Sequence, residues 1–243
     1  MNIDFVQELH DLGLKQFSAV KFDKRSDQHR HIISLYASMT EQTGSLIAIV
    51  RSGSDAGTGS VFRTFLEAYV DLKNLVGDDK YINHLMAKYH SEWIRLLEAA
   101  EKGNNPFLAD VAKIRNFQNI LADRKKHLAN LKANGYHPLT IADQFIKAGM
   151  EDVYRSVYNF QCSESHNDLR ALIGRHLESS GDDFSLVMYR KPSDEELIPM
   201  WDSVAGILWD SGIEVHTYFK SGLVNSFDGL RKTLDELRKK HIG

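Results

Sequence analysis

Apolar residues recur along most of the chain at intervals of three and four residues, the spacing of an amphipathic helix. Only four prolines occur, so long stretches lack the residue that most often interrupts a helix. One segment breaks the pattern: FSLVMYR, between GDD and KP, predicts one arm of a small β-hairpin near residues 184–191. The pattern as a whole predicts an all-α protein with at most that one hairpin.

Capping and helix-breaking residues set the expected limits of the helices. Ser26 is a suitable N-cap, and Ser193 with Glu196 forms a capping-box pattern. GNNP at residues 103–106 breaks the chain, and Gly135 is a favourable residue just after a helix. The expected helices cover residues 1–18, 26–51, 58–76, 79–102, 107–134, 138–149, 151–163, 167–177 and 193–219, followed by an amphipathic C-terminal helix at 223–241.

Length and composition favour one body. The chain has 243 residues, of which 42% are hydrophobic, so a sizeable core can be buried. The sequence contains no repeat, no low-complexity tract and no linker long enough to separate two domains. We therefore expect a single-domain multi-helix bundle over residues 1–243.

Charge and local composition exclude several classes of protein. The formal net charge of -3 provides no global basic field that would draw the chain to nucleic acid or to an anionic membrane. Residues 124–132 hold a local basic patch, which is either a solvated helix face or a contact to an RNA backbone. The N-terminus lacks the apolar region of a signal peptide, and no run approaches the ~18 apolar residues of a membrane span. We expect a cytoplasmic protein without a membrane partner.

Residues that bind metals or form disulfides are sparse. His29 and His31 face apart on a helix, and neither H-E-x-x-H nor paired Glu-x-x-His motifs occur, so we expect no metal and no cofactor. The one cysteine, Cys162, excludes an internal disulfide. It is either a small core residue or a thiol made reactive by His166.

A polar stripe interrupts the most apolar of the expected helices. Over residues 58–76, apolar side chains cover most of the circumference, which predicts deep burial. Arg63, Glu67, Asp71 and Asn74 nevertheless fall on one narrow line, and Arg63 can pair with Glu67 at a spacing of four. The stripe is either the solvated edge of a surface helix or a buried Arg–Glu pair that faces a pocket.

A second polar group lies in residues 151–177. Tyr158, Cys162 and His166 share a helix face if the helix continues, and Ser163 stands three residues before His166. A Ser–His pair could support general-base activation, but no third orienting group is evident and the G-x-S-x-G elbow is missing. The alternative is that Ser163 only caps a helix locally.

These two segments resemble an uncharacterised bacterial helical family, the domain of unknown function numbered 5677. The resemblance rests on R-x-x-x-E in residues 58–76 and on Y-x-x-x-Y-x-x-x-x-S-x-x-H in residues 154–166, and it extends over roughly residues 30–220. The family usually has proline or a small residue after the motif histidine, where this chain has Asn167. The resemblance implies no activity. The recurring polar positions that it implies are Arg63, Glu67, Tyr158, Ser163 and His166.

Helical families of this kind are likened to HEPN proteins, the nucleotide-binding and RNA-cleaving helical domains of defence systems. Their signature is an arginine, four to six residues, and then a histidine. Arg170 with His176 fits this signature, and so does Arg25 with His31. Chance alone supplies roughly two such matches in a chain of this composition, so the signature does not rise above background.

Two classes of function therefore stay open. The first is a HEPN-like, metal-independent ribonuclease or toxin, in which a histidine moves a proton at a ribose 2′-hydroxyl and an arginine stabilises the phosphorane charge. The second is a non-enzymatic helical module that binds or senses a small anionic ligand or a protein partner. A nuclease needs a basic, solvent-open groove, whereas a binding module would show an enclosed cleft. The predicted site residues are Arg63, Glu67, Ser163 and His166 for catalysis and Tyr158, Arg170 and His176 for binding.

Two structural expectations complete the sequence-based interpretation. If the two polar groups form one site, Arg63 and His166 lie within about 12 Å of each other, close to the Debye length at moderate salt. The helix at 193–219 carries Trp201, Leu208 and Trp209 on more than one face. Such residues either complete a core or form an interface, and we expect a homodimer.

Overall fold

The computed structural model describes residues 1–54, 56–166, 168–181 and 183–242. Asn167, the residue after the motif histidine, lies outside these ranges. The described residues are helical apart from connecting turns and one two-stranded hairpin, so the predicted all-α class is confirmed. They group into two compact units, one formed by residues 1–77 with 145–243 and the other by residues 78–144. The prediction of one domain over residues 1–243 stays a prediction.

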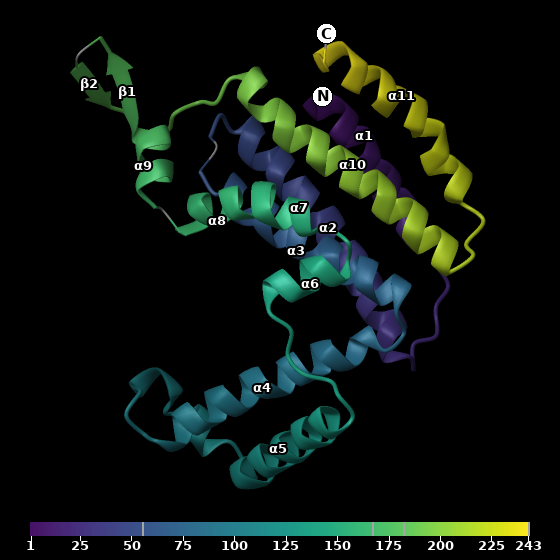
Figure 1. Cartoon of the computed structure of the whole chain (residues 1–243), viewed down its shortest axis with the longest axis vertical. Helices are drawn as coiled ribbons and strands as arrows, with labels where there is room; N and C mark the ends of the chain where they lie inside the picture. Colours follow the sequence, from purple (N-terminus) through teal and green to yellow (C-terminus); the bar gives the residue numbers. More distant parts are fainter. Residues whose placement is uncertain (55, 167, 182, 243) are drawn as a thin grey trace. The chain divides into compact units, whose positions relative to one another are not determined.

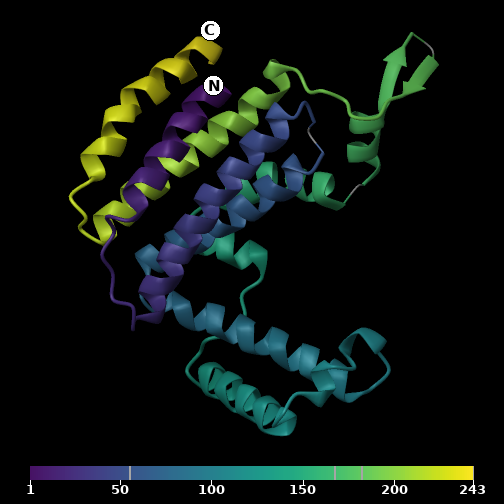
Figure 2. The ribbon, with the colours of Figure 1, turned by 180° about the vertical axis from the view of Figure 1, so that it is seen from behind.

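The long helices of the first unit lie side by side (Figures 1 and 2). Gln28, near the start of α2, donates to the carbonyl of Leu75 near the end of α3 at 2.8 Å, so these two helices run antiparallel. The predicted N-cap Ser26 and the capping box of Ser193 and Glu196 are both confirmed. The long helices are α1 (Ile3–Phe17), α2 (Asp27–Arg51), α3 (Thr58–Gly77), α10 (Asp194–Tyr218) and α11 (Val224–Ile242).

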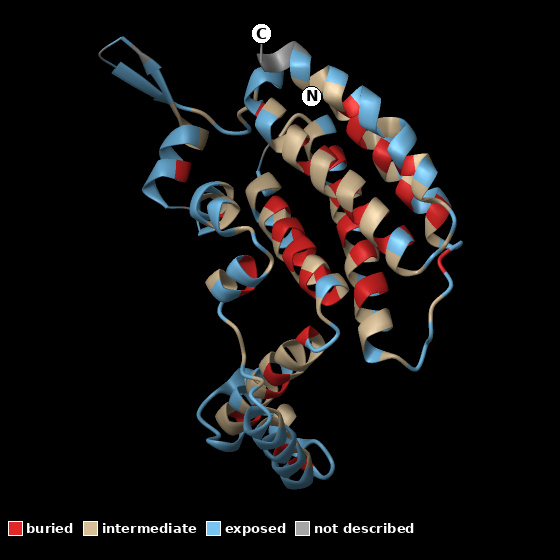
Figure 3. Cartoon of the chain, turned by 45° about the vertical axis from the view of Figure 1, so that its right-hand side comes forward, coloured by how far each residue is buried: buried red, intermediate tan, exposed pale blue. Residues whose placement is uncertain are grey.

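The core of this unit forms where α1, α2, α3 and α10 turn their apolar faces toward one another (Figure 3). Trp201 and Leu208 of α10 are buried in it, so these side chains complete the core. The burial of these two side chains gives no support to a dimer interface, and the homodimer stays a prediction. Other large buried side chains are Leu9, Ile32, Tyr36, Met39, Phe62, Phe65, Leu66 and Leu72.

Shorter helices connect α6 (Ile141–Lys147) to the β-hairpin. A single π-helical stretch, Tyr154–Tyr158, separates α7 (Glu151–Val153) from α8 (Asn159–His166). The helix expected at residues 151–163 continues to His166, and Asp168 caps the next helix, α9 (Leu169–His176), by accepting from the backbone N–H of Ala171 at 3.1 Å.

The hairpin follows α9 directly. Strand β1 (Leu177–Ser180) pairs antiparallel with β2 (Asp183–Leu186), and Leu177 stands opposite Leu186. The predicted strand is therefore confirmed, although it ends at Leu186. Tyr189, beyond it, has a left-handed backbone with φ 57°. The side chains of β2 are exposed, as Figure 3 shows, so backbone pairing holds the hairpin with little apolar burial.

The second unit is a pair of helices, α4 (Tyr81–Glu101) and α5 (Phe117–Ala133). Leu97 and Ala100 of α4 pack against Phe117 and Leu121 of α5. The expected helix over residues 107–134 is wrong in its first third. Two 3₁₀ turns, Pro106–Leu108 and Val111–Lys113, occupy that stretch, and Asn116 adopts a left-handed backbone just before α5 begins.

The helix expected from Pro138 also begins later than predicted. Thr140 and Asp143 cap each other reciprocally, so α6 covers Ile141–Lys147. The capping pair of Thr140 and Asp143 therefore determines where this helix starts, and Pro138 does not. No helix in the described residues is long and apolar enough to cross a membrane.

A glycine lets α11 approach α10 closely. A Cβ atom built on Gly212 would lie 2.3 Å from the ring of the buried Phe227. We expect Gly212→Ala to lower the free energy of unfolding by about 1–3 kcal/mol, because the ring or the helix must move. Chemical denaturation of the purified protein measures this change.

The matched control is Gly229→Ala in α11, where nothing lies within 4 Å of the added atom. This change should raise the free energy of unfolding by up to about 1 kcal/mol, because alanine favours a helix over glycine. Equal stability of the wild type and Gly212→Ala would show that Phe227 does not pack against Gly212.

Candidate functional site

Arg63 and Glu67 stand one turn apart on α3 and form an ion pair. The Nε atom of Arg63 lies 3.0 Å from Oε1 of Glu67. The two side chains are 25% and 30% exposed, so the pair lies at the edge of the core. This outcome falls between the two sequence-based alternatives of a fully solvated stripe and a buried pair.

Tyr158, at the end of the π-helical stretch, closes this pair from the opposite side. Its buried hydroxyl donates to Oε1 of Glu67 at 2.7 Å and accepts from Nε of Arg63 at 3.1 Å. The guanidinium of Arg63 also lies over the Tyr158 ring, 5.4 Å from its centre. The three side chains therefore hold the guanidinium in one orientation, with its Nε–H turned inward.

His166, the last residue of α8, contacts the other side of the same guanidinium. The NH1 atom of Arg63 lies 3.0 Å from Nε2 of His166. The predicted juxtaposition of Arg63 and His166 is thus confirmed. Arginine can only donate, so Nε2 accepts, and the imidazole in this contact is neutral with its proton on Nδ1. His166 is exposed, and solvent reaches this end of the cluster.

A close approach of α3 and α8 brings these residues together. A Cβ atom on Gly59 would lie 2.5 Å from the Cβ atom of Glu164, so only glycine fits between the two helices at this level. Arg175 of α9 in turn donates to the carbonyl of Glu164 at 3.0 Å. Gly59 and Arg175 therefore fix the end of α8 that carries His166.

Burial and hydrogen bonding shift the pKa values within the cluster. Burial alone would lower the pKa of Arg63, but its bond to Tyr158 and the nearby Cys162 and Glu67 outweigh burial and raise that pKa. Burial raises the pKa of Tyr158, and its bond to Glu67 raises it further. The phenol therefore stays protonated and the guanidinium stays charged throughout the physiological range.

Ser163 is not part of this cluster in the described part of the chain. Its hydroxyl donates to Asp168, the cap of α9, and this bond lowers the pKa of the Asp168 carboxyl, as does the backbone N–H of Ala171. Ser163 thus bonds to the cap residue Asp168 and does not itself cap a helix. The catalytic role predicted for Ser163 has no geometric support.

Arg170 and His176 also lie apart from the cluster. Arg170 donates to the carbonyl of Phe160 at 3.2 Å and stacks over its ring. Nδ1 of His176 lies 3.1 Å from the carbonyl oxygen of Val187, next to the hairpin. The Arg–His spacing that fits the HEPN signature thus corresponds to two separate local contacts.

Sequence analysis missed a second polar cluster, which joins α3 to α10. Tyr69 donates to Oδ2 of Asp210 at 2.5 Å, and Lys73 pairs with Glu214 at 2.7 Å and with Asp210 at 3.4 Å. The signal was present as two residues spaced by four on each helix. It escaped notice because such pairs are common on solvated helices.

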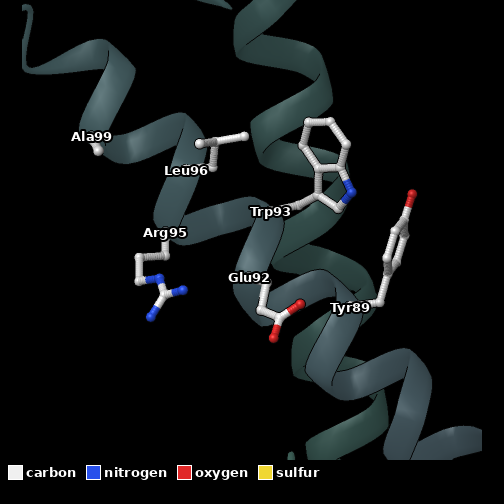
Figure 4. A pocket seen from close by; sticks show the side chains of 6 residues that line it. All are labelled: Tyr89, Glu92, Trp93, Arg95, Leu96 and Ala99. Atoms are coloured by element: carbon white, nitrogen blue, oxygen red, sulfur yellow. The ribbon is translucent and has the colours of Figure 1, made fainter. Parts of the chain in front are cut away.

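The second unit carries a hollow of about 430 Å³ along α4. Figure 4 shows the rings of Tyr89 and Trp93 next to each other on this helix, with Leu96 one turn further on. Arg124, from the predicted basic patch, lies over both rings, and Lys125 pairs with Glu98. Part of the basic patch therefore serves contacts within the helix pair.

Histidines occur on the same helix pair. The rings of His90 and His127 are stacked with their centres 5.3 Å apart. Burial lowers the pKa of His90, and the nearby Arg124 and His127 lower it further. Among the described residues, no group of three or more His, Cys, Asp or Glu side chains is placed to hold a metal ion.

The fold and the cluster thus define an all-α protein with an Arg–Glu–Tyr–His network between two helices. The sequence model of one family, described as a family of unknown function (DUF5677), matches residues 29–184, and the chain belongs to this family. The match ends within β2, which is earlier than the expected limit near residue 220. Neither the curated proteins nor the solved structures gave a significant match.

The hydroxyl of Tyr158 joins both members of the ion pair, so we expect Tyr158→Phe to lower the free energy of unfolding by about 1–2 kcal/mol. Denaturation followed by circular dichroism measures the change. Tyr154→Phe is the matched control, because Tyr154 stacks on Tyr158 in the same π-helical stretch and its hydroxyl has no hydrogen bond among the described residues. Equal losses in both variants would contradict the network.

Proposed function

We propose that the Arg63–His166 pair binds a phosphate-type anion, so that the chain acts as a helical binding module for an anionic ligand. The contact of 3.0 Å between these two side chains carries the proposal. It places the only permanently charged group of the cluster next to a titratable group that faces solvent. A guanidinium and an imidazolium together provide N–H donors, and the oxygens of a phosphate or sulfate accept hydrogen bonds from them.

Protonation of His166 changes the contact from attraction to repulsion. The neutral ring accepts from Arg63, but the protonated ring has a donor at Nε2, and two donors cannot bond to each other. An anion placed between them accepts from both. Glu67 and Tyr158 hold the guanidinium by its Nε–H, so its NH1 atom stays turned toward His166, where an anion between the two side chains would accept from it. Anion binding and uptake of a proton by His166 are therefore linked.

Sulfate tests this proposal, because its charge is constant across the pH range of histidine titration. We expect sulfate to shift the side-chain NMR signals of His166 and to bind more tightly at about pH 5.5 than at about pH 8. Arg63→Gln or His166→Gln should weaken binding at least about tenfold, which corresponds to ~1.4 kcal/mol.

Arg170→Gln is the matched control, because Arg170 is also an exposed arginine close to α8, but its guanidinium lies over the ring of Phe160 and bonds to that residue's carbonyl. Its affinity for sulfate should equal that of the wild type. Binding that is independent of pH, or that responds equally to Arg63 and Arg170, would contradict the proposal.

A second candidate function is a HEPN-like, metal-independent ribonuclease or toxin, and the exposure of His166 beside Arg63 favours it. The neutral imidazole would take the proton of a ribose 2′-hydroxyl while the 2′-oxygen attacks phosphorus. The phosphorus–5′-oxygen bond breaks, the 5′-oxygen takes a proton from water, and a 2′,3′-cyclic phosphate is left. Arg63 would stabilise the charge on the phosphorane oxygens.

Incubation of the purified protein with RNA in the presence of a metal chelator separates the two functions. A nuclease yields fragments ending in 2′,3′-cyclic phosphate, and His166→Ala abolishes them. His176→Ala is the control, because that histidine contacts Val187 and should leave cleavage unchanged. Intact RNA together with sulfate binding at Arg63 and His166 would leave only the binding module.

A further inference from the structure

A cleft of about 380 Å³ opens between α3, the π-helical stretch, α10 and α11. Its volume lies within the range of small-molecule sites. It is separate from the Arg63 cluster, although Val157 lines it and the next residue, Tyr158, belongs to that cluster. The apolar side chains that line the cleft are Leu66, Met150, Val153, Val157, Ile207 and Leu234.

One side of the cleft carries a carboxylate with a free oxygen. Oδ2 of Asp210 accepts from Tyr69 and Lys73, whereas Oδ1 has no hydrogen-bond partner in the part of the chain that the structure describes. Burial raises the pKa of Tyr69, and the bond to Asp210 raises it further, so the phenol keeps donating to this carboxylate. Asp210 therefore offers a fixed acceptor to a ligand.

The opposite charge enters the cleft from α11. The guanidinium of Arg231 lies over the ring of Trp209, 4.8 Å from its centre, and its Nε donates to Asp235. Its two terminal nitrogens have no partner among the described residues, while the Nε1–H of Trp209 is fixed by a bond to the carbonyl of Phe227. Arg231 therefore presents a terminal donor pair of the kind that a carboxylate accepts.

The remaining charged pair in the cleft is already satisfied. Arg238 binds Asp202 through two hydrogen bonds of 2.9 and 3.3 Å. The cleft thus offers one acceptor for a cationic group, at Asp210, and one donor pair for an anionic group, at Arg231, above an apolar floor. A ligand that carries both charges can pair with both groups at once, whereas a ligand with a single charge can pair with only one of them.

We propose that this cleft binds a free α-amino acid with an apolar or aromatic side chain. The ammonium group meets Oδ1 of Asp210, the carboxylate meets the terminal nitrogens of Arg231, and the side chain lies against the apolar floor near Val157 and Ile207. The activity proposed above concerns a different anion on a different set of residues, so the two proposals stand or fall separately.

Isothermal titration calorimetry on the full chain tests the proposal with L-phenylalanine and two analogues that each lack one charge. Phenethylamine lacks the carboxylate, and 3-phenylpropionate lacks the ammonium group. We expect L-phenylalanine to bind at least about tenfold more tightly than either analogue. Absence of binding by L-phenylalanine up to about 10 mM, or equal affinity for all three, would overturn the proposal.

Two variants assign the charges to their partners. Asp210→Asn should weaken the binding of L-phenylalanine at least about tenfold and leave the affinity for 3-phenylpropionate unchanged. Arg231→Gln should weaken the binding of L-phenylalanine and leave the affinity for phenethylamine unchanged. Lys232→Gln is the matched control, because Lys232 is 87% exposed on the same helix and pairs only with Glu236 among the described residues. Equal weakening by Lys232→Gln and Arg231→Gln would overturn the assignment, and thermal melting verifies that each variant folds.

Discussion

The burial of α3 is the constraint on which the rest of the first unit depends. This helix is apolar over most of its circumference, so α2, α8 and α10 must all cover it. Its polar side chains then lie in the seams between helices, where they need partners. At one end of α3, the pair of Arg63 and Glu67 contacts Tyr158 and His166. Further along the helix, the pair of Tyr69 and Lys73 contacts Asp210 and Glu214.

Sequence periodicity predicted the long helices well, because each combines an apolar face with capping residues a few positions away. Ser26 and Ser193 both cap as predicted. The prediction failed over residues 107–116, where apolar residues are spaced as in a helix but pack on α4 through 3₁₀ turns. A left-handed residue such as Asn116 leaves no periodic trace in a sequence, so tertiary packing decided that segment.

The candidate site was predictable in part. Arg63, Glu67, Tyr158 and His166 meet as expected, because an arginine in so apolar a helix needs partners from another segment. The role of Ser163 could not be predicted from its spacing, since a serine at this position can donate to the cap residue of the next helix as readily as to a histidine. The cleft between α10 and α11 could not be predicted for another reason. Its charged side chains come from different helices, and no sequence pattern shows how those helices are aligned with one another.

The limits of the family segment cross the core of the first unit. Residues 29–184 begin inside α2 and end in β2, so they contain α3 but neither α1 nor α10. A polypeptide cut at these limits would leave the buried faces around Ile32 and Leu72 in water. We expect this segment to be stable only together with helices that cover these faces. The segment that the family model matches and the set of helices that buries its apolar faces are thus different stretches of the chain.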